Sequence, residues 1–236
     1  MGKIKLLLVE DDAAFSFIIK GCLELTGNYD VSIASDGKEG LEKYAAFIPD
    51  IIVADIEIPI MSGIELVSVI RRKDTQIPIL FASARTSPKD LIEGYNLGID
   101  NYIRKPFLPE ELNAHVQAIL RRSQSTLLST NETTPYLLKI GKYLFDTKAQ
   151  TLQRQDRTIK LTERESQIIL LLYQQKGKIV KREDILTQCW EHSDFYTSRS
   201  LDVFINKLRK YFKEDPGIEI KTVRKKGILL DIKSVP

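Results

Sequence analysis

The sequence predicts two domains: a doubly wound α/β domain on a five-stranded parallel sheet, followed by a smaller α+β domain. Three observations lead to this prediction. Over residues 1–122, short apolar runs alternate five times with helical patterns, which is the order of a parallel sheet covered by helices. Residues 123–135 hold seven serines and threonines and end in a proline, as linkers do. A chain of 236 residues is also comfortable for two domains of roughly 100–120 residues each.

The elements of the first domain follow from where its apolar runs and helix signals fall. Capping-box spacing at Asp36 and at Ser62 marks two helix starts, and prolines at positions 88 and 109 suit the first turn of two more. The last helix is expected to end at Arg121 and Arg122. The expected strands are residues 4–9, 30–34, 51–54, 77–82 and 101–104.

The second domain, residues 136–236, opens with short alternating segments, continues with helical patterns and closes with two strands around a basic turn. Thr162 and Glu165 have capping-box spacing at the start of its first helix. The helices are expected near residues 163–174, 181–188 and 197–212. The expected strands are Tyr136–Ile140, Tyr143–Phe145, Thr151–Arg154, Glu219–Val223 and Ile228–Ile232.

Composition favours a soluble protein of the cytoplasm. No apolar run approaches the ~18 residues that cross a bilayer, and the residues after Met1 form no secretory signal peptide. A hydrophobic fraction of 43% with 28% charged residues lets each domain bury a core. Cys22 and Cys189 have no metal-type spacing and are expected to be reduced thiols in the core.

The charge is distributed unevenly along the chain. Residues 1–122 hold 14 Lys and Arg against 18 Asp and Glu, a net charge of −4, whereas residues 123–236 hold 21 against 14, a net charge of +7. A basic domain of this kind favours a polyanionic partner, most often nucleic acid. A well-solvated basic surface without such a partner is the alternative.

Five polar residues stand at the ends of the expected strands of the first domain. The carboxyl ends of parallel strands lie at one edge of the sheet, where open sheets bind ligands. Three carboxylates at that edge repel one another unless a cation lies among them, and oxygen ligands without histidine or thiol favour Mg²⁺. The five residues are Glu10, Asp11, Asp55, Ser83 and Lys105.

Asp55 is predicted to accept a phosphoryl group. It ends an apolar strand, and Pro59 is expected to turn the following loop away, so that the carboxylate is exposed. Glu10, Asp11 and the backbone carbonyl of Glu57 are predicted to hold the metal together with Asp55. An aspartate at a strand end also caps helices, which is the alternative for Asp55 taken alone.

A relay from the acceptor is predicted to pass through three further residues. Lys105 is expected to pair with the carboxylate and then with the phosphoryl group, and Ser83 to hydrogen-bond a phosphoryl oxygen. Tyr102 is expected to move into the space that Ser83 leaves. Taken singly, Ser83 is an ordinary small buried residue and Tyr102 an ordinary core residue; the joint placement of the whole set favours the site.

The helical pattern from Thr197 to Phe212 has one apolar face and one basic face. Leu201, Ile205, Leu208 and Phe212 recur at core spacing. The opposite face suits a helix in the major groove of DNA, where lysine reaches guanine, asparagine reaches adenine and valine contacts the thymine methyl group. That face holds Arg199, Val203, Asn206, Lys207 and Lys210.

The basic turn Arg224, Lys225, Lys226 joins the two last strands. A β-hairpin of this charge is typical of a wing that approaches phosphates or enters the minor groove. The alternative is a charged hairpin that is only solvated.

Together these motifs resemble the OmpR/PhoB family of response regulators over essentially the full length. Residues 1–122 look like the family's receiver domain, on the strength of Leu7–Asp12, Asp55 with Pro59 and Gly63, Ser83–Arg85, and Gly98–Phe107. Residues 136–236 look like its winged-helix domain. The motifs there are Leu161–Glu165, Arg182–Leu186 with Trp190, Arg199–Val203, Leu208–Lys210 and Thr222–Arg224.

The resemblance implies a phosphorylation-controlled transcription factor. A sensor histidine kinase would donate the phosphoryl group, Mg²⁺ would be the cofactor, and a homodimer would bind double-stranded promoter DNA, with RNA polymerase as a further partner. The Lys105–Pro106 peptide bond is expected to be cis. Ser200, Arg209 and Thr222 join the predicted DNA contacts by the resemblance alone. The protein is not expected to be an enzyme beyond accepting and slowly hydrolysing its own phosphoryl group.

Three departures from the family pattern fall on the face through which its receivers dimerise. Leu91, Asn101 and His115 stand where a basic residue, an acid and an arginine are usual, so the dimer is expected to be weaker. His115 is a possible pH-sensitive contact or, alternatively, a solvated helix residue. The predicted dimer face is Leu91, Asp100, Asn101, Glu111, His115, Arg121 and Arg122.

Departures in the second domain prevent any carry-over of base preference. Phe204 and Asn206 stand where histidine and arginine are common, and Ile228 replaces an aromatic residue after the wing. Two other functions stay open: a receiver that works unphosphorylated in a constitutive DNA binder, and an aspartyl-phosphate phosphohydrolase, whose chemistry also uses carboxylates, Mg²⁺ and lysine.

Overall fold

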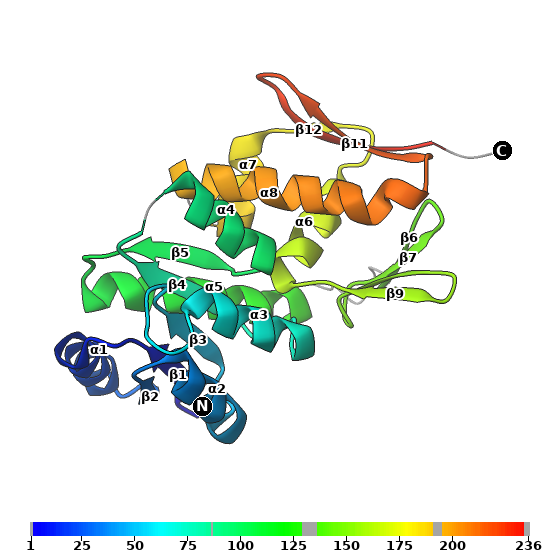
Figure 1. Cartoon of the computed structure of the whole chain (residues 1–236). Helices are drawn as coiled ribbons and strands as arrows, with labels where there is room; N and C mark the ends of the chain where they lie inside the picture. The colour runs from blue at the N-terminus through cyan, green and yellow to red at the C-terminus, as the bar shows by residue number, and fades with distance from the viewer. Residues whose placement is uncertain (1, 86, 129–135, 191–194, 234–236) are drawn as a thin grey trace. The chain divides into compact units, whose positions relative to one another are not determined.

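The computed structural model describes residues 2–85, 87–128, 136–190 and 195–233 and falls into two compact units, Met1–Arg121 and Arg122–Pro236 (Figure 1). Helix α5 (Pro109–Leu128) runs six residues beyond its predicted end at Arg122, so that prediction is wrong. The extension contains no proline or glycine, and serine and threonine cost a helix only a few tenths of a kcal/mol each. Residues 129–135, the rest of the predicted linker, lie outside the described residues.

The first unit is built on a five-stranded parallel sheet in the order β2-β1-β3-β4-β5, which confirms the predicted fold class. Its central strands are buried on both faces, as continuous apolar runs require. The strands are β1 (Ile4–Val9), β2 (Tyr29–Ala34), β3 (Ile51–Ala54), β4 (Ile79–Ser83) and β5 (Asn101–Arg104).

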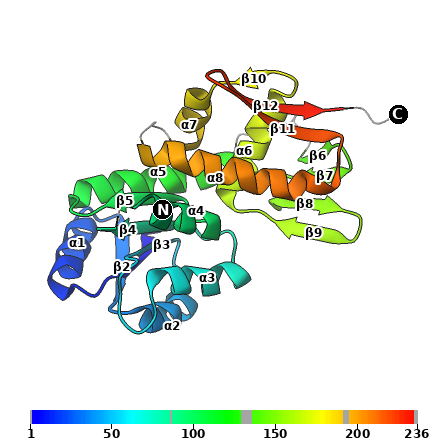
Figure 2. The same ribbon diagram turned by 45° about the horizontal axis from the view of Figure 1, so that its top comes forward.

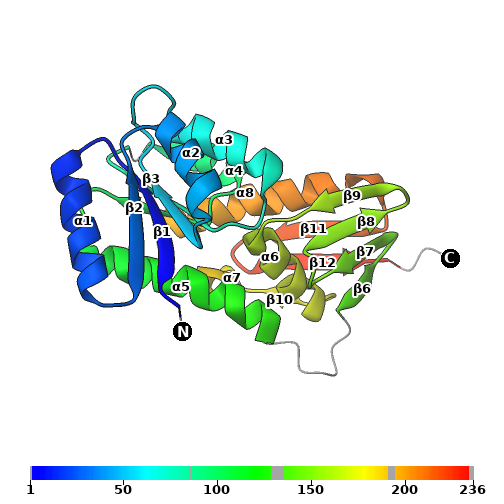
Figure 3. The same cartoon turned by 90° about the horizontal axis from the view of Figure 1, so that it is seen from below.

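Helices cover both faces of this sheet. The face that carries α1 (Ala13–Leu25) and α5 encloses a core of leucine, isoleucine and valine (Figure 3). The other face carries α2 (Gly37–Phe47), α3 (Gly63–Lys73) and α4 (Pro88–Leu97). This arrangement leaves the carboxyl ends of the strands at one edge, which is where the candidate site lies.

The predicted capping box at Ser62 and Glu65 is present at the start of α3. At α2 only half of the predicted box forms. Asp36 accepts a hydrogen bond from the Glu39 backbone N–H, but the Glu39 carboxylate accepts from Ser35 instead of returning to Asp36.

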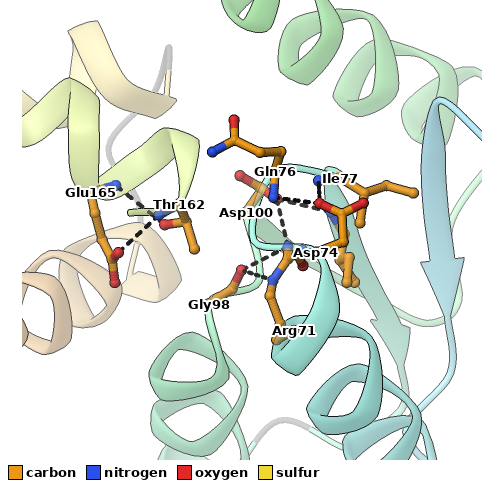
Figure 4. A network of polar contacts seen from close by, with 9 residues as sticks. Arg71, Asp74, Gln76, Ile77, Gly98, Asp100, Thr162 and Glu165 are labelled. Atoms are coloured by element: carbon orange, nitrogen blue, oxygen red, sulfur yellow. Dashed lines mark hydrogen bonds and ion pairs between the residues drawn. The ribbon is translucent and has the colours of Figure 1, made fainter. Parts of the chain in front are cut away.

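Arg71 and Asp100 form a buried ion pair at the amino ends of the strands β4 and β5, the edge of the sheet opposite the candidate site (Figure 4). The guanidinium of Arg71 donates to the carbonyls of Gly98 and Asp74 and lies 3.6 Å from the Asp100 carboxylate. Asp100 in turn accepts from the Ile79 N–H at 2.9 Å. These contacts fix the starts of β4 and β5.

The second unit has two antiparallel sheets, as an α+β domain should, and the predicted strands are present. Two strands were not predicted, because β9 contains a single apolar residue, Ile159, and β10 has two residues in all. One sheet has the order β6-β7-β8-β9 and the other β10-β12-β11. The strands are β6 (Leu137–Ile140), β7 (Tyr143–Asp146), β8 (Thr151–Arg154), β9 (Arg157–Lys160), β10 (Ile179–Val180), β11 (Ile218–Val223) and β12 (Gly227–Ile232).

The described residues of this unit also form three helices. They are α6 (Glu163–Gln174), α7 (Arg182–Trp190) and α8 (Phe195–Tyr211), and the 3-10 turn η1 (Phe212–Glu214) follows α8. Helices α6 and α8 pack against the strands β12 and β11, respectively, and α7 packs against α6 and α8. The predicted capping box of Thr162 and Glu165 is present at the start of α6 (Figure 4). Helix α8 lies beside the hairpin of β11 and β12, which projects from the unit (Figure 2).

One cysteine prediction is confirmed and the other is wrong. Cys189 is buried, but Cys22 is exposed, because the buried stripe of α1 runs through Ser16, Ile19 and Leu23 and leaves Cys22 beside it. Within the described residues, no helix combines the length and the apolar character needed to cross a bilayer.

Candidate functional site

The strand ends of the first unit bring three predicted residues into contact. Glu10 follows β1, Asp55 follows β3 and Lys105 follows β5. The Lys105 Nζ atom lies 2.5 Å from Glu10 Oε2 and 2.6 Å from Asp55 Oδ2. One ammonium group therefore bridges two carboxylates from different strands, and the Lys105–Pro106 peptide bond that follows it is cis, as expected.

Asp55 is not exposed as predicted: it is 7% exposed, and Glu10 is 3% exposed. The loop after Asp55 turns back, because the Gly63 N–H donates to the Ile56 carbonyl and starts α3 directly over the strand end. A Cβ atom at Gly63 would come within 2.1 Å of the Asp55 carbonyl oxygen. The missing side chain of Gly63 is therefore what lets α3 pack this close to Asp55.

The electrostatics of the site reflect two acids that share one cation. Burial raises the pKa of the Glu10 carboxyl, and the hydrogen bond and charge of Lys105 offset this only in part. Burial acts to lower the pKa of Lys105, but hydrogen bonds to Asp55 and Glu10 outweigh it, so this pKa is raised. The ammonium is stabilised by two carboxylates, whereas the two carboxylates share a single cation. The site thus keeps a surplus of negative charge.

Asp11 and Glu57 complete the predicted metal ligands. Asp11 is exposed next to Glu10, and the Glu57 backbone N–H donates to Asp55 Oδ1 at 3.1 Å, which orients the Asp55 side chain from the β3–α3 loop. The described residues hold no group of three acidic, histidine or cysteine side chains that is already gathered around one point. The donors nevertheless fit a hard divalent cation, because they are all oxygens and carry excess negative charge.

Ser83 and Tyr102 are joined through one backbone segment. Ser83 is fully buried at the end of β4, and its hydroxyl accepts from the Arg85 N–H at 3.4 Å. The Tyr102 hydroxyl donates to the Arg85 carbonyl, and the ring is 4% exposed, packed edge-on against Phe81. The Arg85 backbone therefore contacts both side chains.

Sequence reasoning missed the ion pair between Arg85 and Glu57, two residues after Asp55. The Arg85 guanidinium lies 2.8 Å from Glu57 Oε1 and 3.6 Å from Asp90. The pair connects the β3–α3 loop to the β4–α4 loop. A signal was present, since the two residues stand two positions after Asp55 and after Ser83, with opposite charges.

Three residues of the predicted dimer face are buried inside the first unit. Leu91 is fully buried on the same stripe of α4 as Tyr95, and Asp100 is 4% exposed against Arg71. These residues are therefore not on the surface, contrary to the prediction. Asn101 is also buried, and its amide lies 2.9 Å from His115 Nδ1. Glu111 and Arg121 are exposed, and the side chain of Arg122 lies outside the described part of the chain.

Helix α8 has the predicted core face, but the buried stripe is wider than the spacing indicated. Leu201, Ile205, Leu208 and Phe212 are buried, and so are Ser200 and Val203. The helix packs against α6, α7 and β11 together, which covers a broader arc than one neighbour would. The expectation that Val203 lies on the open face is wrong. Arg199, Asn206 and Lys210 are exposed.

Lys207 points to another helix of its own unit. Its Nζ atom lies 2.5 Å from Glu165 Oε1, and the Glu165 side chain is 1% exposed. Glu165 also accepts from the Thr162 N–H and from the Tyr211 hydroxyl, whose pKa is raised by burial and by the Glu165 charge. The Lys207 ammonium therefore compensates a buried carboxylate on α6.

Arg209 connects α8 to β11 rather than standing free on the surface. Its guanidinium donates to the Ile220 carbonyl and the Thr222 hydroxyl, each at 2.8 Å, and to Asn206 Oδ1 at 3.0 Å. One side chain thus orients Asn206 and Thr222, two of the residues predicted to contact DNA.

The basic turn forms as predicted between β11 and β12, with Arg224, Lys225 and Lys226 exposed. Gly227, at φ +148, lets the turn pass so close to β10 that a Cβ atom would meet the Val180 carbonyl at 2.0 Å. Lys225 and Lys226 line a cavity of about 640 Å³ together with Lys181 and Arg182. No role was predicted for Lys181 from the sequence.

Comparison with known proteins matches both units. The family described as "Response regulator receiver domain" matches residues 6–117, and "Transcriptional regulatory protein, C terminal" matches residues 155–230. Transcriptional regulatory protein RprY of Bacteroides fragilis is 36% identical over 228 residues, which cover 97% of this chain and 94% of the relative. PhoP of Bacillus subtilis, an alkaline phosphatase synthesis transcriptional regulatory protein, is 34% identical over 232 residues and 96% of each chain.

Solved structures agree with these matches. A mutant of RitR superposes with a TM-score of 0.72 at 24% identity, covering 97% of this chain and 99% of that one, which supports the fold. The response regulator DrrB, an OmpR/PhoB homologue of Thermotoga maritima, covers the same shares with a TM-score of 0.50 and 26% identity. Full-length relatives, both domain families in order and the bridged carboxylates lead to one conclusion: the chain belongs to the OmpR/PhoB family of response regulators.

Proposed function

We propose that Asp55 accepts a phosphoryl group from a sensor histidine kinase and that this controls promoter binding by the second unit. The observation that carries the proposal is the Lys105 ammonium held within 2.6 Å of both Glu10 and Asp55 at the carboxyl edge of the sheet. A cation placed against the acceptor carboxylate is what stabilises the charge of a phosphoryl group in transfer.

The transfer balances without any further reactant. The P–N bond to the kinase's histidine breaks, a P–O bond to a carboxylate oxygen of Asp55 forms, and the imidazole leaves with the electron pair. Lys105 would then pair with the phosphoryl oxygens, and the Ser83 hydroxyl would donate to one of them. Such a movement of Ser83 would reach Tyr102 through the Arg85 backbone that both contact.

Glu10, Asp11, Asp55 and the Glu57 carbonyl are the residues that would hold Mg²⁺. When bound, the ion supplies positive charge to the phosphoryl oxygens. The raised pKa of Glu10 supports this assignment. Its first cause is burial, which disfavours the charged carboxylate, and a bound divalent cation would stabilise that charge.

For the output, exposed cationic and amide side chains would contact DNA. Arg199, Asn206 and Lys210 on α8 suit the major groove, and Arg224 to Lys226 suit phosphates or the minor groove. The positive net charge of this half of the chain supports a polyanionic partner. A homodimer and RNA polymerase are further proposed partners.

A second candidate is a regulator that binds DNA without phosphorylation. Asp100 and Asn101 are engaged with Arg71 and His115 inside the first unit, so they are poorly placed for contacts between subunits. A receiver with few charges for dimerisation would depend less on its phosphoryl group.

One experiment separates the two candidates. The full chain and Asp55→Ala are incubated with radiolabelled acetyl phosphate and Mg²⁺, and each is then footprinted on genomic promoter DNA. Label on the wild type alone, with a footprint that strengthens on labelling, supports phosphorylation control. Equal footprints for both proteins favour the second candidate, and an unlabelled wild type contradicts the first.

A further inference from the structure

We propose that Phe15 is a positioning residue for Lys105, and this inference rests on the proposed phosphoryl transfer to Asp55. The Lys105 Nζ atom lies 5.0 Å from the centroid of the Phe15 ring. That distance is within the range of a cation–π contact, in which the negative face of the ring attracts the ammonium.

The ring is held in place from two sides. The Phe15 N–H donates to the N-cap carboxylate of Asp12 at 3.0 Å, which fixes the first turn of α1. Phe107 packs edge-on against the ring with centroids 5.3 Å apart and planes at 79°. Phe107 stands two residues after Lys105, so the ammonium and the ring that supports Phe15 come from the same loop.

The contact between Lys105 and the Phe15 ring matters because it can persist during phosphoryl transfer, whereas the hydrogen bonds of Lys105 have to change partners. An ammonium group has three N–H donors, and those of Lys105 reach Glu10 and Asp55 in this structure. When a phosphoryl group arrives, the ammonium has to turn so that one N–H donates to a phosphoryl oxygen. The ring of Phe15 holds the ammonium by its face throughout, so Lys105 turns without leaving the acceptor.

Packing alone is the alternative role for Phe15. The side chain is half-buried and rests against the apolar core under α1 and α5. A substitution such as Phe15→Leu changes both packing and ring electrons, so it does not separate the two roles. Fluorination of the ring does, because it withdraws charge from the face of the ring while the shape stays nearly the same.

The test replaces Phe15 by phenylalanine with one, two and three ring fluorines in the full chain. The readout is the rate of acyl-phosphate formation at Asp55 from acetyl phosphate in Mg²⁺ buffer, followed by intact-protein mass spectrometry. We expect the rate to fall stepwise with fluorine content, by about fivefold for the trifluorinated ring, and Phe15→Tyr to retain the wild-type rate.

A matched control exists in the same unit. Lys5 lies 5.3 Å from the centroid of Phe47, a second cation–π contact that no proposed step uses. Fluorination at Phe47 should leave the rate unchanged. Equal rates across the Phe15 series, with melting temperatures also equal, would overturn the inference while wild-type labelling still supports the proposed function. A wild-type protein that takes up no phosphoryl group would instead contradict the proposed function itself.

Discussion

The two units each contain a buried glutamate bound to a lysine at the same distance, yet the two pairs have different consequences. Glu10 and Lys105 lie 2.5 Å apart, and so do Glu165 and Lys207; the lysine side chains are 18% and 22% exposed. Geometry and burial therefore do not distinguish a pair proposed to take part in phosphoryl transfer from a structural one.

The surroundings of each pair make the difference. Lys105 is shared with a second acid, Asp55, so the charges of the site do not cancel. Glu165 instead accepts hydrogen bonds from the Thr162 N–H and the Tyr211 hydroxyl, and one lysine completes its partners. A surplus of buried charge indicates a site that still needs a ligand, and a balanced set indicates structure.

Exchanging the two lysines for methionine gives the largest expected effect. Lys105→Met should lower the rate of phosphoryl uptake from acetyl phosphate by about 100-fold or more, because it removes the cation nearest the transferred group. Lys207→Met should leave that rate unchanged. If both variants lose uptake equally, or neither does, the distinction between the two pairs fails.

The reverse effect is expected on the stability of the second unit. Lys207→Met should lower its free energy of unfolding by about 1–3 kcal/mol, since it leaves the Glu165 charge buried without its cation. Urea unfolding followed by the fluorescence of Trp190, the single tryptophan, reports on this unit. Lys210→Met, which removes the same charge from an exposed position of α8, is the control and should be neutral. A Lys207→Met protein of full stability that loses only sequence-specific DNA binding would show instead that Lys207 reads a base.

A smaller effect is expected from the wing. Arg224→Ala should weaken binding to specific and random duplexes alike, by about tenfold, and lower the slope of log affinity against log salt by about 1. Fluorescence anisotropy over a salt series measures both quantities. Lys148→Ala, an exposed lysine in the turn after β7, should change neither, and a loss confined to one sequence would contradict a phosphate contact.

The smallest effect concerns an ion pair that is not buried. The pKa of Glu39 is lowered to about 2, first by its contact with Lys43 and then by Ser35. Its stabilisation is present above its ordinary pKa of 4.5 and is lost as the pH falls towards about 2. The Glu39 side chain is 36% exposed, so Glu39→Gln should lower the free energy of unfolding by only about 0.5–1 kcal/mol at neutral pH.

Urea titrations at several pH values check this, with the exposed Glu42→Gln as control. The difference between wild type and Glu39→Gln should shrink as the pH falls. A difference that grows on acidification would contradict this, because it would mean that the stabilisation does not come from the ionised carboxylate of Glu39.

The first unit was more predictable from sequence than the second for a physical reason. Strand ends in a parallel sheet meet at one edge whatever the loops do, so the contact of Glu10, Asp55 and Lys105 followed from their positions in the chain. Burial of Asp55 did not follow, because it depends on the close approach of α3 at Gly63.

The spacing of apolar residues predicts which face of a helix is buried, but not which elements pack beside that helix. The pattern of α8 predicted the core residues, yet the burial of Val203 and the contact of Lys207 with Glu165 depend on which helices pack beside it. Leu91, which the family resemblance placed on the dimer face, is also part of the core. Side chains whose partners lie far away in the chain are the ones that pattern alone does not place.

The contacts of Arg209 set the separation between the two parts of the second unit that are proposed to contact DNA. Its guanidinium spans from Asn206 on α8 to Ile220 and Thr222 on β11, so the length of one arginine fixes how far the helix stands from the hairpin before any duplex arrives. Operators whose grooves match that preset spacing would bind without rearrangement, and a lysine at this position, shorter and unable to form the fork, would select a different groove geometry.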